Sequence, residues 1–371
     1  MSTTKTSTAP LEYALYSESV EVKKPDEDRV FEEIAATMRG ISETFNDRAR
    51  NAYRSVHAKS HGLLKGELQV FDNLPEPYRQ GLFARPGTYG TIMRFSTNPG
   101  DILPDSISTP RGLAVKVIGI EDAEMVPEHA GHKTQDFVMV NGRVFGVPDS
   151  SGFLKQLHLL AKHVGDSQSL KQFVSTTARA AESTVEVFGG ESMLLKQFGH
   201  PETNLLGESY STQLPLRYGS HIAKISIEPS SDNLRALTGE GLEIDHYSAL
   251  RDWVVDFFKS EAAEWEVKVQ LCTNLVRMPV EDASVEWPEK ESAYVPVARI
   301  VVPAQNAYSP ERRVFVDELL SFNPWHAMAA HQPLGNVMRA RRLAYAMSSK
   351  YRHTANGRQM LEPNSISEIP D

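Results

Sequence analysis

One pair of residues late in the chain combines a tyrosine with a cation at helical spacing. Arg341 and Tyr345 are four residues apart, so on a helix one would lie above the other. A tyrosine oxygen binds ferric iron as phenolate, and with an ordinary pKa near ~10 it needs positive charge nearby to ionise at neutral pH. Arginine supplies that charge because its guanidinium keeps its proton. A surface arginine above a half-buried tyrosine would give the same pattern, so the spacing alone leaves both interpretations open.

The histidines offer a second candidate. His57 and His61 are four residues apart and would share one face of a helix, as a pair of metal ligands does, but a strand or loop there would separate them. A buried histidine with ordinary hydrogen-bond partners is the alternative for each. Generic enzyme motifs are missing, since the chain has no phosphate-binding loop, dinucleotide-binding glycine motif, zinc-binding H-E-x-x-H or nucleophile elbow.

Five segments, taken in order, resemble motifs of the haem catalase superfamily, and in particular of its short, catalase-related peroxidase branch. The family patterns are R-x-x-H-A-K, R-F-S-T, P-R-G-F-A-V-K, T-P-x-F-F-x-x-D-x-x-x-F, and F-D-P followed by R-x-x-x-Y. The matching segments are Arg54-Ser-Val-His57-Ala-Lys59, Arg94-Phe-Ser-Thr97, Pro110-Arg-Gly-Leu-Ala-Val-Lys116, Thr134-Gln-Asp-Phe-Val-Met-Val-Asn-Gly-Arg-Val-Phe145, and Phe322-Asn-Pro324 with Arg341-Arg-Leu-Ala-Tyr345. Each segment is short, so their order and spacing carry the resemblance.

The resemblance implies a role for each matching residue. Tyr345 would be the haem iron ligand, with Arg341 supplying the charge that keeps it ionised. His57 would be the distal acid/base that moves a proton between the two oxygens of a bound peroxide. Ser96 would orient His57 by a hydrogen bond, and Phe145 would pack on the distal face of the porphyrin. For Phe145 an ordinary core position remains an alternative.

The resemblance also implies how an acidic chain could hold an anionic cofactor. Arg54, Arg94 and Arg352 fall on the arginines that pair with the haem propionates, and arginine forks suit carboxylates. Arg352 follows Tyr345 by seven residues, two turns further along a helix. Taken singly, each of the three would be interpreted as a surface charge. The expected cofactor is haem b.

Three departures from the family pattern bear on activity. Lys133 stands where the family has its distal asparagine, with Gln135 and Asn141 as the nearby amides. Ser349 stands four residues after the tyrosine, where large catalases often have histidine. The chain also ends soon after Tyr345, which predicts that it lacks the C-terminal helical region of large catalases. A missing asparagine and a more accessible haem would favour oxidation of small organic donors over release of oxygen.

The elements that would position these residues follow from periodicity. Residues 1–27 are polar and are expected to form a flexible arm, with 28–371 as a single catalase-like haem domain. The predicted helices span 28–46, 153–164, 167–182, 185–198, 247–264 and 337–349, and the predicted strands span 66–71, 93–97, 112–118, 136–140, 221–228, 267–271 and 295–302. The strands cluster without regular β-α alternation, which favours an α+β fold. With the resemblance, the expectation is a closed antiparallel β-barrel with surrounding helices.

Composition limits the partners. The chain has 371 residues, 40% of them hydrophobic, and a net charge of −9, which argues against nucleic-acid binding. No apolar run reaches the ~20 residues that cross a bilayer, so no membrane insertion is expected. The one cysteine, Cys272, lies in a strand-like segment and is expected to be buried. With no secretory signal visible, the expected location is the cytoplasm, with a homo-oligomer possible.

The resulting hypothesis is a haem-dependent peroxidase that reduces hydrogen peroxide or organic hydroperoxides with small organic donors, with weak catalase side activity. Allene oxide synthases and fatty-acid hydroperoxide lyases resemble catalases too and rearrange a lipid hydroperoxide instead. Those synthases tend to have threonine where this chain has Arg341, so the arginine favours peroxide reduction. A haem carrier or sensor without catalysis is a third possibility, against which His57 speaks.

Overall fold

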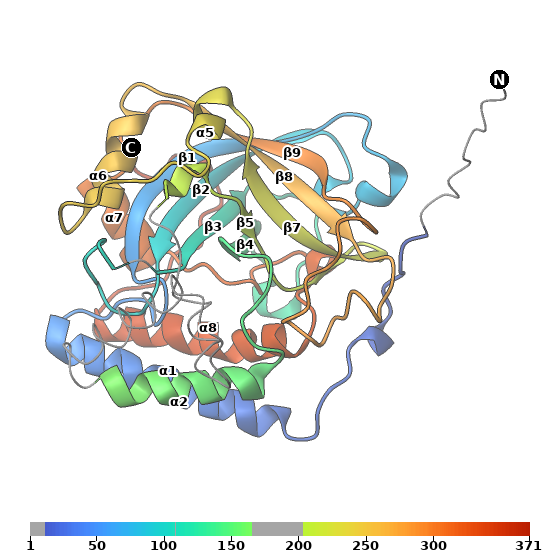
Figure 1. Cartoon of the computed structure of the whole chain (residues 1–371), viewed down its shortest axis with the longest axis horizontal. Helices are drawn as coiled ribbons and strands as arrows, with labels where there is room; N and C mark the ends of the chain where they lie inside the picture. Colours follow the sequence, from blue (N-terminus) through green and yellow to red (C-terminus); the bar gives the residue numbers. More distant parts are fainter. Residues whose placement is uncertain (1–11, 108, 165–202) are drawn as a thin grey trace.

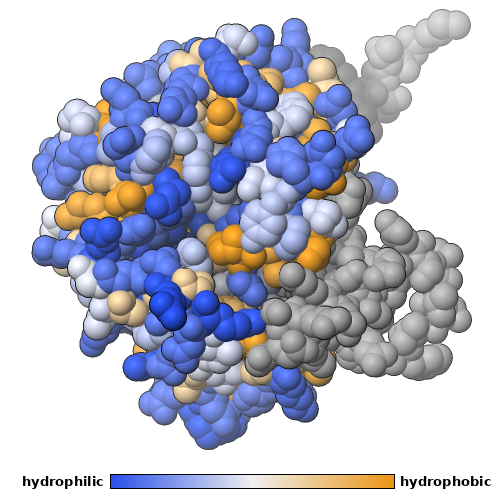
Figure 2. Space-filling model, turned by 90° about the vertical axis from the view of Figure 1, so that its left-hand side faces the viewer, coloured by the Kyte–Doolittle hydropathy of each residue, from blue (hydrophilic) through white to orange (hydrophobic). Residues whose placement is uncertain are grey.

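A computed structural model of the chain describes residues 12–107, 109–164 and 203–371. Hydrophilic side chains cover most of the face shown in Figure 2, and hydrophobic ones appear there in separate patches. In the described part of the chain, no helix combines the length and the apolar character needed to cross a membrane.

Eight antiparallel strands close into a barrel (Figure 1). Around the barrel they are β1 (Lys59–Val70), β2 (Gly87–Thr97), β3 (Arg111–Ile118), β4 (Thr134–Val140), β5 (Tyr210–Ser211), β7 (His221–Pro229), β8 (Ala263–Leu271) and β9 (Val295–Val302), which pairs with β1 again. The two-residue strand β5 completes the closure because it pairs with β4 on one side and β7 on the other. The short β6 (Leu216–Tyr218) forms a hairpin with β7. The predicted closed antiparallel barrel is confirmed.

The barrel is filled by side chains from alternate strand positions. In β8, Ala263, Trp265, Val267 and Val269 are buried, while the charged residues between them are half-buried. This period of two places one face of the strand inside the barrel. The enclosed core continues through the rings of Phe95 and Trp265, whose centroids are 6.1 Å apart. Such dense packing makes the barrel wall rigid, and a rigid wall can fix side chains that point outward from it.

Three long helices lie together along one side of the barrel, namely α1 (Glu27–Ala49), α2 (Ser150–Val164) and α8 (Asn336–Ala355) (Figure 1). Their apolar stripes meet in a second core that includes Ile34, Met38, Leu157, Ala340 and Ala344. Acidic Glu27 and Asp28 in the first turn of α1 favour the helix there. The barrel and this helical layer are the two walls that could enclose a flat cofactor.

The remaining described helices are short. They are α5 (Asp232–Ala236), α6 (Ala249–Phe258), α7 (Pro310–Arg313), a π-helical turn (Val314–Leu319), and 3-10 turns at Glu18–Val20, Glu76–Tyr78, Gly81–Phe83, Pro127–His129, Leu205–Gly207, Ala329–His331 and Ile366–Glu368. The π-helical turn matters below, because π turns in helical segments are uncommon and often occur at functional sites.

Most predicted elements are found, with β9 at its predicted bounds. Strand β1 begins seven residues earlier than predicted, at Lys59, because its first half is buried on both faces and does not alternate. Helix α6 ends at Phe258, so the predicted helix to residue 264 is wrong at its end, where β8 begins at Ala263. The predicted helices 167–182 and 185–198 lie outside the described residues.

The start of the described chain is attached to the barrel. The backbone N–H of Ala14 donates to the carbonyl of Cys272 at 2.8 Å, and that of Tyr16 donates to Ser220 at 2.8 Å. Cys272 is fully buried, as expected, and burial raises the pKa of its thiol to about 11. Part of the segment expected to be a flexible arm therefore packs on the barrel.

Candidate active site

Two adjoining cavities lie between the barrel wall and the helical layer. The larger has a volume of about 510 Å³ and is lined by α1, α8, the end of β4 and the segment that follows it. The smaller, about 70 Å³, is lined by β2, β3, β4, α8 and the segment before β1. His57, Met38, Val138, Ala344 and Tyr345 line both cavities, so the two form one continuous slot. Its volume is in the range of small-molecule and cofactor sites.

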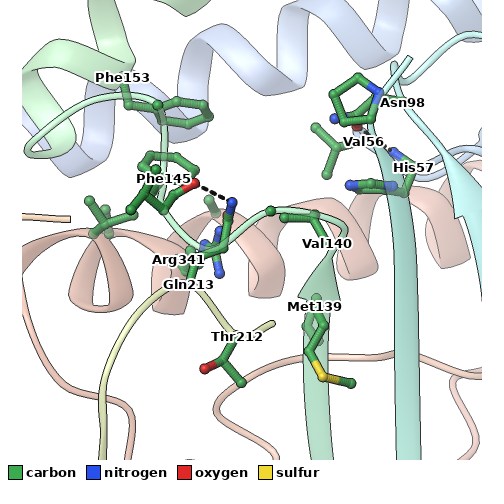
Figure 3. Close-up of a pocket in the computed structure, with 18 of the residues that line it drawn as sticks. Val56, His57, Asn98, Met139, Val140, Phe145, Phe153, Thr212, Gln213 and Arg341 are labelled. Atoms are coloured by element: carbon green, nitrogen blue, oxygen red, sulfur yellow. Dashed lines mark hydrogen bonds between the residues drawn. The ribbon is translucent and has the colours of Figure 1, made fainter. Parts of the chain in front are cut away.

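His57 lies at the turn between α1 and β1. Its φ of 51° is unusual for a residue other than glycine. Its backbone N–H donates to Asn98 Oδ1 at 3.2 Å. A chain of hydroxyls joins this segment to both helices, since Ser55 Oγ lies 2.7 Å from Ser42 Oγ of α1 and 2.7 Å from Ser348 Oγ of α8. These contacts fix the turn on the edge of the slot, where Figure 3 shows His57 beside Asn98.

The imidazole of His57 packs against a glycine. A Cβ at Gly112 in β3 would lie 2.5 Å from His57 Nδ1 and 3.0 Å from Ser96 Oγ. A side chain at that position would therefore push the ring out of place. The structure brings Ser96 and His57 to the same glycine, but the Ser96 hydroxyl donates a long bond to the Gly112 carbonyl at 3.5 Å rather than to His57.

His57 is held in its neutral form. It is half-buried because it faces the slot, yet protein surrounds it, and this desolvation lowers its pKa to about 3, with the charges of Arg94 and Arg341 acting in the same direction. Its Nδ1 has no hydrogen-bond partner among the described residues. A neutral imidazole that lines a cavity can accept a proton and return it.

Asn98 is an amide in direct contact with His57, and the sequence analysis did not identify it. It directly follows the Arg94-Phe-Ser-Thr97 segment, which was the only signal that could have drawn attention to it. Its Oδ1 accepts the His57 N–H, and its side chain lines the larger cavity.

The residues that the sequence placed at or near the missing amide are engaged in other contacts. Lys133 is exposed and forms an ion pair with Glu121 at 2.7 Å, so its side chain points to solvent. Gln135 accepts from the Met328 N–H at 2.9 Å, away from the slot. Asn141 lines the larger cavity, but its Oδ1 accepts the Arg111 N–H and its Nδ2 donates to Glu208.

Tyr345 and Arg341 both belong to α8 and line the slot. The small residues Ala340 and Ala344 on the same face leave room beside Tyr345 for a flat group. The guanidinium of Arg341 lies over the Phe145 ring, 5.3 Å from its centroid. Figure 3 shows Arg341, Phe145, Phe153 and Gln213 together, on the side of the cavity away from His57.

The three arginines expected to hold propionates converge at the smaller cavity. Arg94 Nε donates to Asp317 Oδ1 at 2.8 Å, and Arg54 Nη1 donates to the same oxygen at 3.0 Å. Arg352 Nη1 donates to the carbonyls of Asp317 and Glu318 at 2.7 and 2.8 Å. Burial lowers the pKa of Arg352 to about 10, and burial with the charges of Arg94 and Arg352 lowers the pKa of Arg54. Asp317 was not singled out from the sequence.

His61 does not pair with His57. It lies in β1, where its Nε2 is 2.9 Å from Thr97 Oγ1, so the strand separates the two rings. Within the described ranges, the one group of three potential metal ligands is Asp136, His326 and Glu362. Lys116 Nζ lies among them, 2.7 Å from Asp136 Oδ1, so an ammonium already supplies the positive charge there.

The slot fits a haem in its donor set and in its surface. It offers a tyrosine on the helical wall, an unpartnered histidine on the barrel wall, apolar side chains between them and three arginines at one end. Tyrosine is a known axial ligand of haem iron, and arginines suit its two carboxylates.

Comparisons with known proteins agree with this arrangement. A family model described as Catalase matches residues 37–366. A search of curated proteins gave no match. The chain is similar to solved structures of a fungal catalase (TM-score 0.58, 20% identity, 87% of this chain and 62% of that one), catalase A from Saccharomyces cerevisiae (0.60, 19%, 84% and 64%) and a bacterial catalase (0.56, 18%, 95% and 68%). The chain thus spans about two thirds of the length of these proteins, and the likeness supports the fold.

Proposed function

Because the chain belongs to the catalase family, we propose that it binds haem b in the slot and cleaves the O–O bond of peroxides as a peroxidase. The observation that carries the proposal is that His57 and Tyr345 line the same slot from its two walls, with three arginines at one end. When bound, the haem would supply the redox-active iron that the reduction of a peroxide requires.

The chain's own residues supply ligation and proton transfer. Tyr345 Oη would hold the iron from α8, and Arg341, one turn earlier, would provide positive charge on the same helix face. On the barrel wall, neutral His57 takes a proton from one peroxide oxygen and returns it to the leaving oxygen. Its lowered pKa keeps the imidazole in the neutral form at neutral pH, which is the form that has a lone pair for the proton. Phe145 and the other apolar lining residues exclude water from the slot.

The ligand assignment is tested by Tyr345→Phe, which removes the phenol oxygen and keeps the ring. Purified wild-type protein should contain about one haem b per chain, and the variant should lose haem or show an altered absorption spectrum. Met347→Leu, a change of similar size on the same helix, is the matched control and should retain the wild-type spectrum. An unaltered spectrum at full haem content in Tyr345→Phe would show that another residue is the ligand.

The peroxidase assignment follows from the position of Lys133. With no side chain from that position in the slot, the second peroxide needed for oxygen release lacks the amide that the family provides. Small organic donors would then compete well for the oxidising equivalents. Peroxide consumption, oxygen release and oxidation of a phenolic donor should be measured on one preparation. Donor oxidation should exceed oxygen release at equal peroxide.

Asn98 favours a second candidate, catalase turnover. Its Oδ1 is engaged by the His57 N–H, but its Nδ2 group faces no described partner, and the side chain borders the larger cavity. If Nδ2 holds a second peroxide, Asn98→Ala will lower oxygen release and leave donor oxidation in place. Oxygen release that dominates in the wild type and falls in Asn98→Ala would replace the peroxidase assignment with the catalase one.

A further inference from the structure

The three arginines at the end of the slot contact one short segment. Besides the bonds to Asp317 Oδ1, Arg54 Nη2 donates to the carbonyls of Val316 and Leu320 at 2.7 and 3.0 Å, and Arg352 Nη2 donates to Leu320 at 2.8 Å. This segment is the π-helical turn Val314–Leu319 together with Leu320, the residue that follows it. The segment therefore places five acceptors, only one of them ionised, around three guanidinium groups.

Asp317 is the carboxylate that partly neutralises the positive charge of the three arginines. It lies in ion pairs with Arg54 and Arg94, and Ser60 Oγ donates to its other oxygen. Burial would raise the pKa of Asp317, but the charges of Arg94 and Arg54 outweigh it and hold the pKa below its ordinary value. The neighbouring Glu318 differs, because its side chain points to the exposed residues Arg358 and Arg313, at 3.0 and 3.7 Å.

We propose that Asp317 matches the charge of the cofactor pocket to a dicarboxylate porphyrin. The ionisable side chains that line the smaller cavity are Arg54, His57, Arg94, Tyr345 and Arg352. Three guanidinium groups carry +3, Asp317 behind them carries −1, and the sum of +2 equals the opposite of two ionised propionates. A buried charge without a partner is costly, so a buried pocket for two carboxylates calls for a matching positive charge.

The arginines can serve both partners at once. Among the described residues, Arg94 Nη1 and the Nε groups of Arg54 and Arg352 have no hydrogen bond. The other guanidinium nitrogens are bound to the segment 316–321, except Arg94 Nη2, which donates to the carbonyls of His57 and Ala58. All three arginines line the cavity. Asp317 thus holds the guanidinium groups from the side away from the cavity. The remaining N–H donors can bind carboxylates in the cavity without displacing Asp317.

The inference rests on the proposed haem binding. It predicts that Asp317→Asn leaves the arginine cluster with one positive charge more than the two propionates can neutralise. This near-isosteric change raises the cluster to +3. The haem-free protein should become less stable, while the two propionates should be held more tightly, by on the order of tenfold for one added unit charge at close range. The effect requires charged propionates, so it should vanish for a porphyrin whose carboxylates are esterified.

The test titrates the full-length, haem-free chain with iron(III) protoporphyrin IX and, separately, with its dimethyl ester, following the absorption of the bound porphyrin. Asp317→Asn should bind the free acid about tenfold more tightly than wild type and bind the ester unchanged. Glu318→Gln is the matched control, because the adjacent carboxylate pairs with Arg358 and Arg313 and acts only through its charge on Arg352, so its effect on the affinity for the free acid should be smaller than that of Asp317→Asn. Thermal unfolding of the haem-free proteins should show a lower midpoint for Asp317→Asn than for Glu318→Gln.

A double variant covers the case in which Asp317→Asn alone does not fold. Arg54→Gln with Asp317→Asn removes one charge of each sign and returns the cluster to +2, so it should fold and bind the free acid within about threefold of wild type. Equal changes for the acid and the ester, or a double variant that binds no better than Arg54→Gln alone, would overturn the role of Asp317. A wild-type chain that binds the ester and acid equally weakly would overturn haem binding itself.

Discussion

His57 and Arg352 both line the smaller cavity, but they differ in hydrogen bonding and in charge. His57 Nδ1 has no partner among the described residues, and its ring is neutral. Arg352 donates to the carbonyls of Asp317, Glu318 and Leu320 and keeps its charge in a buried position. The difference separates two tasks: a group that must exchange protons is left unsatisfied, and a group that must hold a ligand in place is fixed by surplus hydrogen bonds.

The variant with the largest expected effect is His57→Ala, which tests whether proton transfer and haem binding depend on different residues. Loss of a positioned acid/base should slow peroxide cleavage roughly 10²–10⁴-fold, while haem content stays at the wild-type level because the arginines and Tyr345 are untouched. Peroxide consumption per bound haem measures the first quantity, and the absorption of the purified protein measures the second. Wild-type rates in this variant would move proton transfer to another residue, and loss of haem would show that His57 also serves binding.

The reverse test is Arg352→Gln. It removes a charge-assisted donor worth about 1.5–3 kcal/mol, so haem affinity should fall roughly 10–100-fold while the cleavage rate per bound haem changes little. Arg358→Gln is the matched control, since Arg358 is exposed and pairs with Glu318 outside the slot. The separation of tasks fails if Arg352→Gln lowers the rate per bound haem as much as it lowers affinity.

Because His57 is neutral in the folded chain, we expect the free energy of unfolding to decrease in acid. The pKa of His57 in the folded chain, about 3, lies below the ordinary histidine value of 6.5. Between these two values the unfolded chain binds the extra proton, so stability falls as pH falls. At pH 5 this amounts to about 2 kcal/mol. Thermal unfolding of wild type and His57→Gln at pH 7.5 and pH 5 should show a smaller acid loss in the variant. Equal losses would mean that His57 is not desolvated.

Gly112→Ala is the variant with the smallest expected effect, because it only shifts the His57 ring. The added methyl would lie 2.5 Å from His57 Nδ1, so the ring must shift, and peroxide cleavage should slow about tenfold with haem retained. Gly40→Ala is the control, because a Cβ at that position in α1 meets nothing within 4 Å and should leave the rate unchanged. Equal rates in the two variants would show that the position of the His57 ring is not decisive.

The parts of the site that lie in regular elements or continuous motifs could be predicted from the sequence. Tyr345, Arg341 and Arg352 share one helix, and the alternation of β8 and β9 marked the barrel. Asn98 and Asp317 were missed because their positions depend on contacts between distant segments. Asp317 meets Arg94 across 223 residues of chain, and a π-helical turn has no periodic signature that sequence reasoning could recognise.

The closure of the barrel has a mechanical consequence. Each of its eight strands has a neighbour on both sides, so there is no free edge at which a strand could detach. The opposite wall consists of α1, α2 and α8, which contact one another mainly through side chains. Admitting a rigid macrocycle therefore calls for displacement of helices, at a lower free energy than opening strands. Hydrogen exchange in the haem-free chain should be fastest in α1 and α8 and should slow there when haem is loaded.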